Sequence, residues 1–317
     1  MASESTPQGD GYIIETRELR RDFKKTRAVD ALDLTIHPGE LFGLVGPDGA
    51  GKTTTLRLLG GLLDITSGSA SVAGYDLTTQ AEKVKPKIGY MAQQFSLYGE
   101  LSVLENINFF ADLFNVPTSE LSERRERLLE FAGLVEFKER RAVHLSGGMQ
   151  KKLALACTLI HEPQILLLDE PTTGVDPVSR REFWDILTEL YIGGTTIIVS
   201  TPYMDEADRC SRVGLMYAGR MVVCAPPEEI RSQIPGELIE LRPDDWQAAH
   251  DLVANLPGVQ EVQTYGELLH LVVDSAEGRL PQIESALQEN GLTYHGIRKA
   301  PPRMEEAFIS LIGQIEA

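Results

Sequence analysis

The chain has 317 residues, of which 42% are hydrophobic, so it carries enough apolar sequence for the cores of about two domains. Its formal net charge of −17 argues against broad contact with nucleic acid or anionic lipid headgroups, because both require a positive protein surface. The three cysteines, an odd number, argue against a disulfide framework and favour a reducing compartment. No apolar run reaches the roughly 18 residues that a membrane span requires. Residues 1–10 lack the pattern of a secretory leader, and we expect them to be disordered.

From residue 13 to about residue 224, short apolar runs alternate with longer helical patterns. This alternation is typical of a mostly parallel sheet covered by helices on both faces, and it predicts an α/β domain over residues 11–227. Within this domain, charged helical periodicity predicts an inserted helical subdomain at about residues 95–160. The clearest expected elements are strands at 41–45, 165–168 and 195–200 and a helix at 53–63.

A second domain is expected after the pair Pro226-Pro227, over residues 228–317. Its pattern reads strand, helix, strand, strand, helix, strand, helix, which is the order of a small ferredoxin-like α+β domain. The expected strands are 238–241, 259–264 and 268–273, and the long helices lie near 246–255 and 280–290. We find no catalytic constellation in this segment, so we expect a structural or regulatory role for it.

A phosphate-binding loop is predicted where the first of these strands meets the first helix. Residues 46–53 read GPDGAGKT and satisfy G-x-x-x-x-G-K-[ST]. A chance match is the alternative, but the preceding strand and following helix favour a true loop whose amides surround phosphate. The residues expected to hold the nucleotide here are Gly46, Gly49, Ala50, Gly51, Lys52, Thr53 and Thr54. Lys52 would also assist catalysis by reaching the β- and γ-phosphates, and Thr53 would coordinate Mg²⁺.

Two adjacent carboxylates follow the buried run 165–168. Asp169 stands at the carboxyl edge of that strand, where open α/β sheets bind ligands, and is expected to hold Mg²⁺. Glu170 could polarise a water for in-line attack on the γ-phosphate. Alone, such a pair is often only a solvated strand end; beside a phosphate loop, the catalytic interpretation is favoured.

Residues 145–150, LSGGMQ, resemble the signature sequence of the ABC ATPases, and they lie before Asp169 as in that family. The resemblance spans about residues 12–224 and implies a P-loop NTPase cassette that binds ATP and Mg²⁺. It implies that Ser146, Gly147 and Gly148 bind the γ-phosphate of ATP held by a partner cassette in a head-to-tail dimer. As a bare pattern, this segment is only a helix start.

Further positions match the same family. Gln93 corresponds to the glutamine that touches Mg²⁺ or the attacking water, with a surface amide as the alternative. Phe23 falls where the family stacks an aromatic ring on adenine; a core phenylalanine is the rival interpretation. Asp176 lies in a segment that resembles the loop linking the two sites, but it could be an ordinary turn or cap residue.

Two positions depart from the family pattern. Pro202 stands where the family has a switch histidine that contacts the γ-phosphate, and proline offers neither a side-chain donor nor an N–H group. We therefore expect normal ATP binding with slow hydrolysis, or reliance mainly on Glu170. Asp48 stands where asparagine or serine is commoner, and we expect its carboxylate to point away from phosphate and cap the loop.

The last helix, within residues 301–313, resembles the closing helix of cassettes from ABC-2 type exporters. The resemblance implies a multi-span ABC-2 permease on a separate chain, a homodimer or a heterodimer with another ABC cassette, and a periplasmic adaptor reached through the permease. It places the chain at the cytoplasmic face of the inner membrane, and no nucleic acid is expected as a partner. The alternatives are a soluble ABC ATPase that clamps a ribosome or other macromolecule, and a regulatory cassette impaired in hydrolysis.

Overall fold

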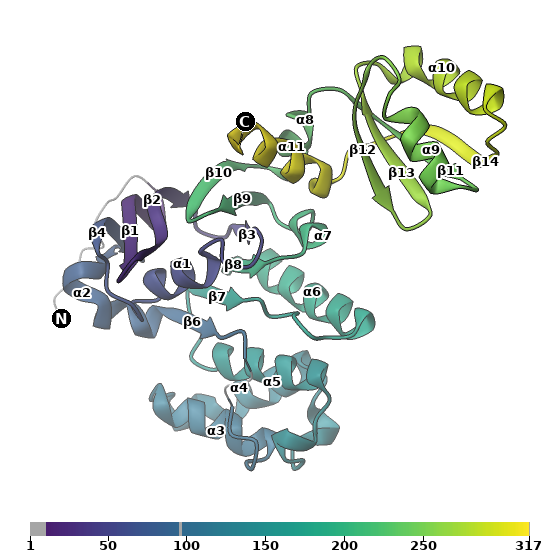
Figure 1. Cartoon of the computed structure of the whole chain (residues 1–317). Coiled ribbons are helices and arrows are strands. Elements are labelled where there is room, and N and C mark those ends of the chain that lie inside the picture. The colour runs from purple at the N-terminus through teal and green to yellow at the C-terminus, as the bar shows by residue number, and fades with distance from the viewer. Residues whose placement is uncertain (1–10, 95–96, 317) are drawn as a thin grey trace. The chain divides into compact units, whose positions relative to one another are not determined.

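The computed structural model describes residues 11–94 and 97–316, so the lead-in expected to be disordered, residues 1–10, lies outside the described residues. The chain forms two compact units, Met1–Pro227 and Glu228–Ala317 (Figure 1). The boundary between them falls directly after the pair Pro226-Pro227.

The main sheet of the first unit has the strand order β10-β9-β3-β8-β7-β6. Its strands are β3 (Leu41–Val45), β6 (Ile88–Met91), β7 (Ile165–Asp169), β8 (Thr196–Thr201), β9 (Arg212–Tyr217) and β10 (Arg220–Ala225). Neighbouring strands are parallel except β9 with β10. Every residue of β3, β7 and β8 is buried, which is why their sequences are nearly continuous apolar runs. The three strands predicted here are confirmed.

A smaller antiparallel sheet packs in the same unit, in the order β2-β1-β4-β5. Its strands are β1 (Ile14–Phe23), β2 (Thr26–Ile36), β4 (Ser67–Val72) and β5 (Tyr75–Asp76). Buried side chains of both sheets, among them Ile14, Val72 and Leu44, share one apolar core with Leu56 of the helix that follows β3.

The helices of the first unit are α1 (Lys52–Leu59), α2 (Leu77–Val84), α3 (Val103–Leu113), α4 (Thr118–Phe131), α5 (Gly147–Leu159), α6 (Pro177–Ile192) and α7 (Met204–Ala207). Helices α3, α4 and α5 gather beyond β6 (Figure 1), at the place of the predicted helical subdomain. The helix predicted at 53–63 ends earlier, at Leu59. Gly60 closes its last turn and Gly61 turns the backbone to φ +63°, which stops the helix.

The second unit has the predicted element order. Its elements are α8 (Pro227–Ser232, which begins at the boundary), β11 (Glu237–Pro243), α9 (Trp246–Val253), β12 (Val259–Tyr265), β13 (Leu268–Val273), α10 (Ala276–Glu289), β14 (Tyr294–Ala300) and α11 (Met304–Glu316). The sheet order β12-β13-β11-β14, antiparallel throughout, is that of a ferredoxin-like domain. Helix α10 begins four residues before the predicted Leu280, because Ser275 caps it and Pro281 is accommodated inside it.

The register of the parallel strands decides where the chemistry lies. Val45 at the end of β3 pairs with Thr201 of β8, and Asp169 at the end of β7 pairs with Ser200. Met91 at the end of β6 pairs with Leu168. The segments that leave these strands therefore meet at one edge of the sheet, where ligands of such folds bind.

Candidate nucleotide site

The loop between β3 and α1 passes so close to neighbouring backbone that side chains are excluded at two positions. A Cβ on Gly46 would lie 2.3 Å from the Met216 carbonyl oxygen, and one on Gly51 would lie 2.4 Å from the Ala28 carbonyl oxygen. Gly51 also has φ +106°, a backbone conformation that favours glycine. Gly49, by contrast, faces open space. Neighbouring backbone therefore confines the loop at Gly46 and Gly51, and the loop faces open space at Gly49.

A pocket of about 450 Å³ opens in front of this loop. Its lining residues are Phe23, Thr26, Arg27, Ala28, Asp48, Gly49, Ala50, Gly51, Lys52, Thr53, Thr54, Gln93 and Glu170. Phe23 is 40% exposed at the pocket, so it is not a core residue, and the Arg21 guanidinium lies 4.6 Å from the centre of its ring. Asp48 lines the pocket, and no side chain caps the start of α1. The cap of the loop by Asp48 stays a prediction.

Oxygen ligands suitable for a hard cation converge on Asp169. The Thr53 hydroxyl donates to Asp169 Oδ1 at 2.9 Å, and the Ser200 hydroxyl donates to the same oxygen at 2.8 Å. The Tyr90 hydroxyl donates to Asp169 Oδ2 at 3.2 Å, and burial is the main cause that raises the pKa of Tyr90. A threonine hydroxyl and one carboxylate are the few protein ligands that Mg²⁺ takes when substrate phosphates supply others. The arrangement fits Mg²⁺ with ATP.

Glu170 is buried, with φ +45°, and the side chains of three residues hold it in place. Lys52 Nζ lies 3.3 Å from Glu170 Oε1 and also donates to the carbonyl oxygen of Gly46 at 2.9 Å. Gln93 Nε2 donates to Glu170 Oε2 at 2.6 Å, so its amide is not simply a surface group. The Glu170 N–H group lies 3.0 Å from Ser200 Oγ. Backbone strain of this kind persists only where surrounding contacts fix it, and it is typical of active sites.

No histidine is among the described residues that line the pocket. Pro202 directly follows β8, and the residue before it, Thr201, donates to Glu206 Oε2 at 2.6 Å. Glu206 is buried and also accepts from Thr172 at 2.7 Å and from Arg180 at 2.7 Å. The strand end thus has its own polar network, but this network offers no imidazole to a phosphate.

Comparison with known proteins identifies the family. The family described as "ABC transporter" matches residues 29–173. The Nod factor export ATP-binding protein I of Cupriavidus metallidurans is 34% identical over 304 residues, covering 95% of this chain and 98% of that protein. The chain belongs to the ABC transporter ATP-binding family.

Other relatives of this ABC cassette carry related names. A probable multidrug ABC transporter ATP-binding protein of Escherichia coli is 42% identical over 288 residues, covering 90% of this chain but 49% of that protein, so the chain spans about half its length. The daunorubicin resistance ATP-binding protein DrrA3 of Streptomyces coeruleorubidus is 36% identical over 303 residues, with 95% of each chain covered.

Solved structures agree with the cassette fold. CbiO1 of Clostridium perfringens, part of an ABC transporter complex, superposes with a TM-score of 0.66 at 27% identity over 78% of this chain and 97% of that one. A dimeric ATP-binding cassette, MJ0796, bound to ADP and phosphate in a post-hydrolysis state, superposes with a TM-score of 0.62 at 26% identity, over 67% of this chain and 98% of that one.

The signature residues of the cassette lie outside its own pocket. Ser146 is the N-cap of α5, where its hydroxyl accepts from the Met149 N–H group at 3.3 Å. Gly148 allows α5 to pack against α6, because a Cβ there would lie 2.5 Å from the Ser179 side chain. Gly147 is exposed, with a carbonyl of the neighbouring loop 3.9 Å from its Cβ position.

Asp176 is also placed away from the pocket. It caps α6 by accepting from the N–H groups of Val178 and Ser179 at 3.1 and 3.0 Å. Its pKa is lowered chiefly by the hydrogen bonds from Ser179. Within this chain Asp176 is therefore an ordinary cap residue, which is the alternative that the sequence left open.

Sequence reasoning missed three residues of the cassette's site. Tyr90 and Ser200 bond Asp169, and Lys151 Nζ donates to the Gln93 carbonyl oxygen at 2.6 Å. Burial lowers the pKa of Lys151, while Asp169 and Glu170 oppose this shift. Ser200 could have been found as a polar residue at the end of a predicted strand; Tyr90 and Lys151 carry no such signal.

Within the described residues, no helix is long and apolar enough to cross a membrane. Across residues 11–94 and 97–316 there is also no group of three or more His, Cys, Asp or Glu side chains that could hold a metal.

Proposed function

We propose that this cassette binds and hydrolyses ATP and thereby powers export through a separate ABC-2 type permease. One observation carries the hydrolytic part: Lys52 and Gln93 both contact Glu170, in the pocket of the phosphate loop. Ammonium, amide and carboxylate groups so placed are what phosphoryl transfer to water requires, since catalysis there is mainly positioning and charge neutralisation.

The residues take distinct roles in this proposal. The glycine-rich loop, with Ala50 and Thr54, would hold the phosphates through backbone N–H groups, and Phe23 would stack on adenine. Lys52 would exchange its contact with Glu170 for the β- and γ-phosphates, which frees that carboxylate to orient the attacking water. Thr53 and Asp169, with Gln93, would hold Mg²⁺, which when bound neutralises phosphate charge.

Dimer closure would complete the site. Ser146 and Gly147 are exposed at the start of α5 and lie outside the pocket, which supports their use toward ATP on a second cassette. Gly148 and Asp176 would shape and link the two sites. The second cassette is either another copy of this chain or a different ABC cassette.

The permease partner is inferred from the relatives, whose names refer to multidrug transport, Nod factor export and daunorubicin resistance. Exposed apolar side chains on the helical subdomain, including Tyr98, Phe109 and Leu113, would receive a cytoplasmic helix of the permease. The chain would then lie at the cytoplasmic face of the inner membrane. A drug or other amphipathic molecule is the proposed cargo, and a periplasmic adaptor would be reached only through the permease.

The rate of hydrolysis tests the site. Because Pro202 provides no donor to the γ-phosphate, we expect slow turnover that Pro202→His raises by roughly tenfold or more. Glu170→Gln should lower turnover by roughly 10²- to 10⁴-fold while leaving ATP affinity nearly unchanged. Phosphate release and nucleotide binding measure the two effects, with Pro302→His in the second unit as the control. If Pro202→His leaves turnover unchanged while Glu170→Gln abolishes it, the missing histidine does not limit the rate.

The export role requires its own experiment. The full chain is captured from detergent-solubilised native membranes and its bound partners are identified by mass spectrometry. Recovery of a multi-span permease is the expected result. Recovery of ribosomes, or of the chain alone, contradicts the exporter proposal and favours a clamp ATPase.

A further inference from the structure

A second pocket, of about 540 Å³, lies away from the phosphate loop, and no residue lines both. It is bordered by the last turns of α4 and α6, by the end of α5, and by the loops that lead into β7 and β8. Its volume is in the range of sites that hold drug-sized ligands, about 300–1,000 Å³. The nucleotide chemistry described above makes no use of it.

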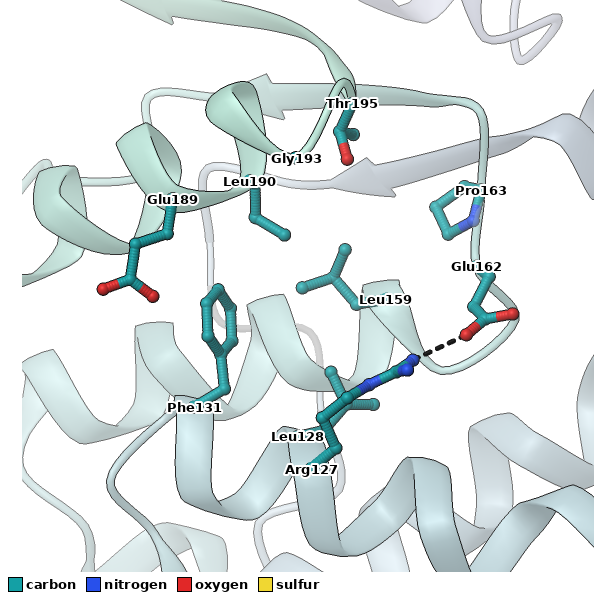
Figure 2. Close-up of a pocket in the computed structure, with 10 residues that line it drawn as sticks. All are labelled: Arg127, Leu128, Phe131, Leu159, Glu162, Pro163, Glu189, Leu190, Gly193 and Thr195. Atoms are coloured by element: carbon teal, nitrogen blue, oxygen red, sulfur yellow. Dashed lines mark hydrogen bonds and ion pairs between the residues drawn. The ribbon is translucent and has the colours of Figure 1, made fainter.

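The interior of this pocket is apolar. Leu128 and Phe131 of α4, Leu159 of α5 and Leu190 of α6 project toward a common space (Figure 2). Leu128 and Leu159 are buried, and Phe131 and Leu190 are half-buried. A ligand that displaced water from these side chains would gain the free energy of apolar burial.

The two carboxylates at this pocket differ in their cationic partners. Glu162 is neutralised twice, by Arg127 at 2.6 Å and by Arg124 at 2.9 Å. Glu189 is exposed and stands on the other side of the apolar side chains (Figure 2), and its carboxylate has no hydrogen bond or ion pair among the described residues. One carboxylate of the pocket is therefore left without a cation.

The helix ends add negative potential of the same sign. Helices α4, α5 and α6 all finish at this pocket, and none has a basic residue in its last turn. A helix C-terminus carries a partial negative charge of at most about −0.5. At the ends of α4 and α6, backbone N–H groups of the following residues already pair several of the last carbonyl oxygens, including those of Leu128 and Leu190. Arg124 donates to the Ile160 carbonyl oxygen at 3.2 Å and so serves the end of α5. The last turns of α4 and α6 contain no basic residue, and Glu189 lies in the last turns of α6.

From this geometry we propose that the pocket is a binding site for amphiphilic organic cations. The apolar body of the ligand would contact Leu128, Leu159 and Leu190. Its cationic group would lie beside Glu189, on the side of the pocket where the aromatic ring of Phe131 lies. Such a ligand would touch α4 and α5 of the helical subdomain and α6 of the α/β core at once, and would restrict motion between them.

Two ions of the same shape and opposite charge test the proposal. Tetraphenylphosphonium and tetraphenylborate are each titrated into the full chain, and binding is measured by equilibrium dialysis. We expect saturable binding of the phosphonium ion, with the borate ion bound at least roughly tenfold more weakly. Saturating ATP should not displace the phosphonium ion, because the two pockets share no lining residue. Binding is read directly, so the result does not depend on hydrolysis or transport.

Variants locate the site. Glu189→Gln keeps the size of the side chain and should weaken phosphonium binding about fivefold. Leu190→Trp should abolish it by filling the interior. Glu130→Gln, an exposed carboxylate of α4 that does not line the pocket, is the matched control and should change nothing. Equal binding of the two ions, displacement by ATP, or phosphonium binding that survives both pocket variants would overturn the proposal.

Discussion

Two acidic residues at the end of β7 are positioned by side chains that come from distant parts of the sequence. Asp169 accepts from Tyr90, at the end region of β6, and from Ser200, near the end of β8. Ser200 also lies next to the backbone N–H group of Glu170. Residues that fix the ligands of a metal in this way commonly alter metal affinity when they are removed. Ser200 thus serves both carboxylates through one hydroxyl.

At this scale we predict that Ser200→Ala raises the Mg²⁺ concentration needed for half-maximal ATP hydrolysis, by roughly tenfold. The variant keeps Thr53 and Asp169 but removes the hydroxyl that orients the carboxylate. A titration of phosphate release against Mg²⁺ measures the effect. Ser211→Ala is the control, because Ser211 donates to the Leu41 carbonyl oxygen at the start of β3, away from the site. A Mg²⁺ requirement that shifts equally in both variants would contradict the role given to Ser200.

Helix packing explains one signature glycine without reference to a partner. The N-terminal turns of α5 and α6 approach so closely at Gly148 that a Cβ there would lie 2.5 Å from both Cβ and Oγ of Ser179. These atoms cannot move far, since the Ser179 N–H group is held by the Asp176 cap. The two helices therefore fix the relative position of the signature segment and the loop before α6.

We predict that Gly148→Ala destabilises the first unit by about 1–3 kcal/mol, because an inserted methyl group overpacks a close contact. Ser179→Gly removes the opposing atoms, so the double variant should recover part of the lost free energy of unfolding. Urea denaturation measures the four proteins of this cycle. Gly147→Ala, whose Cβ would meet only a carbonyl oxygen at 3.9 Å, should be nearly neutral for stability. An additive double variant would show that Ser179 is not the cause.

In the second unit, a buried contact between a histidine and a carboxylate joins α11 to the sheet. Residues alternate between the faces of β13: Leu269 and Leu271 enter the core with α9 and α10, while His270 faces the other side. There His270 Nδ1 lies 2.6 Å from Glu306 Oε1, and Glu306 Oε2 accepts from the Arg303 N–H group at 2.7 Å. Tyr265 stacks on the imidazole ring.

This pair predicts a pH dependence. Burial raises the pKa of Glu306, but the contacts with His270 and Arg303 outweigh it and leave the pKa lowered. A carboxyl group with a lowered folded pKa stabilises the fold above its unfolded pKa, about 4.3, and loses this contribution as the pH falls through the folded value. Glu306→Gln should therefore reduce the loss of stability below about pH 4.3. Denaturation across that pH range measures the effect, with Glu305→Gln as the control. If the free energy of unfolding falls with pH at the same slope in the unchanged chain and in both variants, the prediction is contradicted.

At the scale of the molecule, all residues that line the nucleotide pocket belong to the first compact unit. A ligand stabilises the structure that binds it, by about 2.7 kcal/mol when its concentration is 100 times the dissociation constant. The second unit has its own apolar core, formed by β11, β13, α9 and α10, and such cores unfold as units.

We predict two calorimetric unfolding transitions for the full chain. Mg²⁺ with ATP should raise the midpoint temperature of only one of them. The shifted transition should be the larger, since the first unit has more residues. Lys52→Ala should remove most of the shift and leave the unshifted transition in place. A single transition, or two transitions whose midpoint temperatures ATP raises equally, would show that the units unfold together.

The element order of the second unit, the phosphate loop and the two acidic residues at the end of β7 could be predicted from the sequence alone. Their signals are local: a glycine pattern between an apolar strand and a helix, and carboxylates directly after a buried run. Helix limits were less certain, as the early end of α1 at Leu59 demonstrates, because Gly60 and Gly61 act through backbone geometry that apolar periodicity does not encode.

The tertiary structure alone decided which distant groups meet. Tyr90 and Ser200 reach Asp169 because parallel strands align their carboxyl ends, and Lys151 reaches Gln93 because α5 packs beside β6. The pocket near Glu189 exists because three helices end at the same place, although their last turns are far apart in the chain. Contacts of this kind depend on register and packing between elements, so no local pattern of residues could predict them.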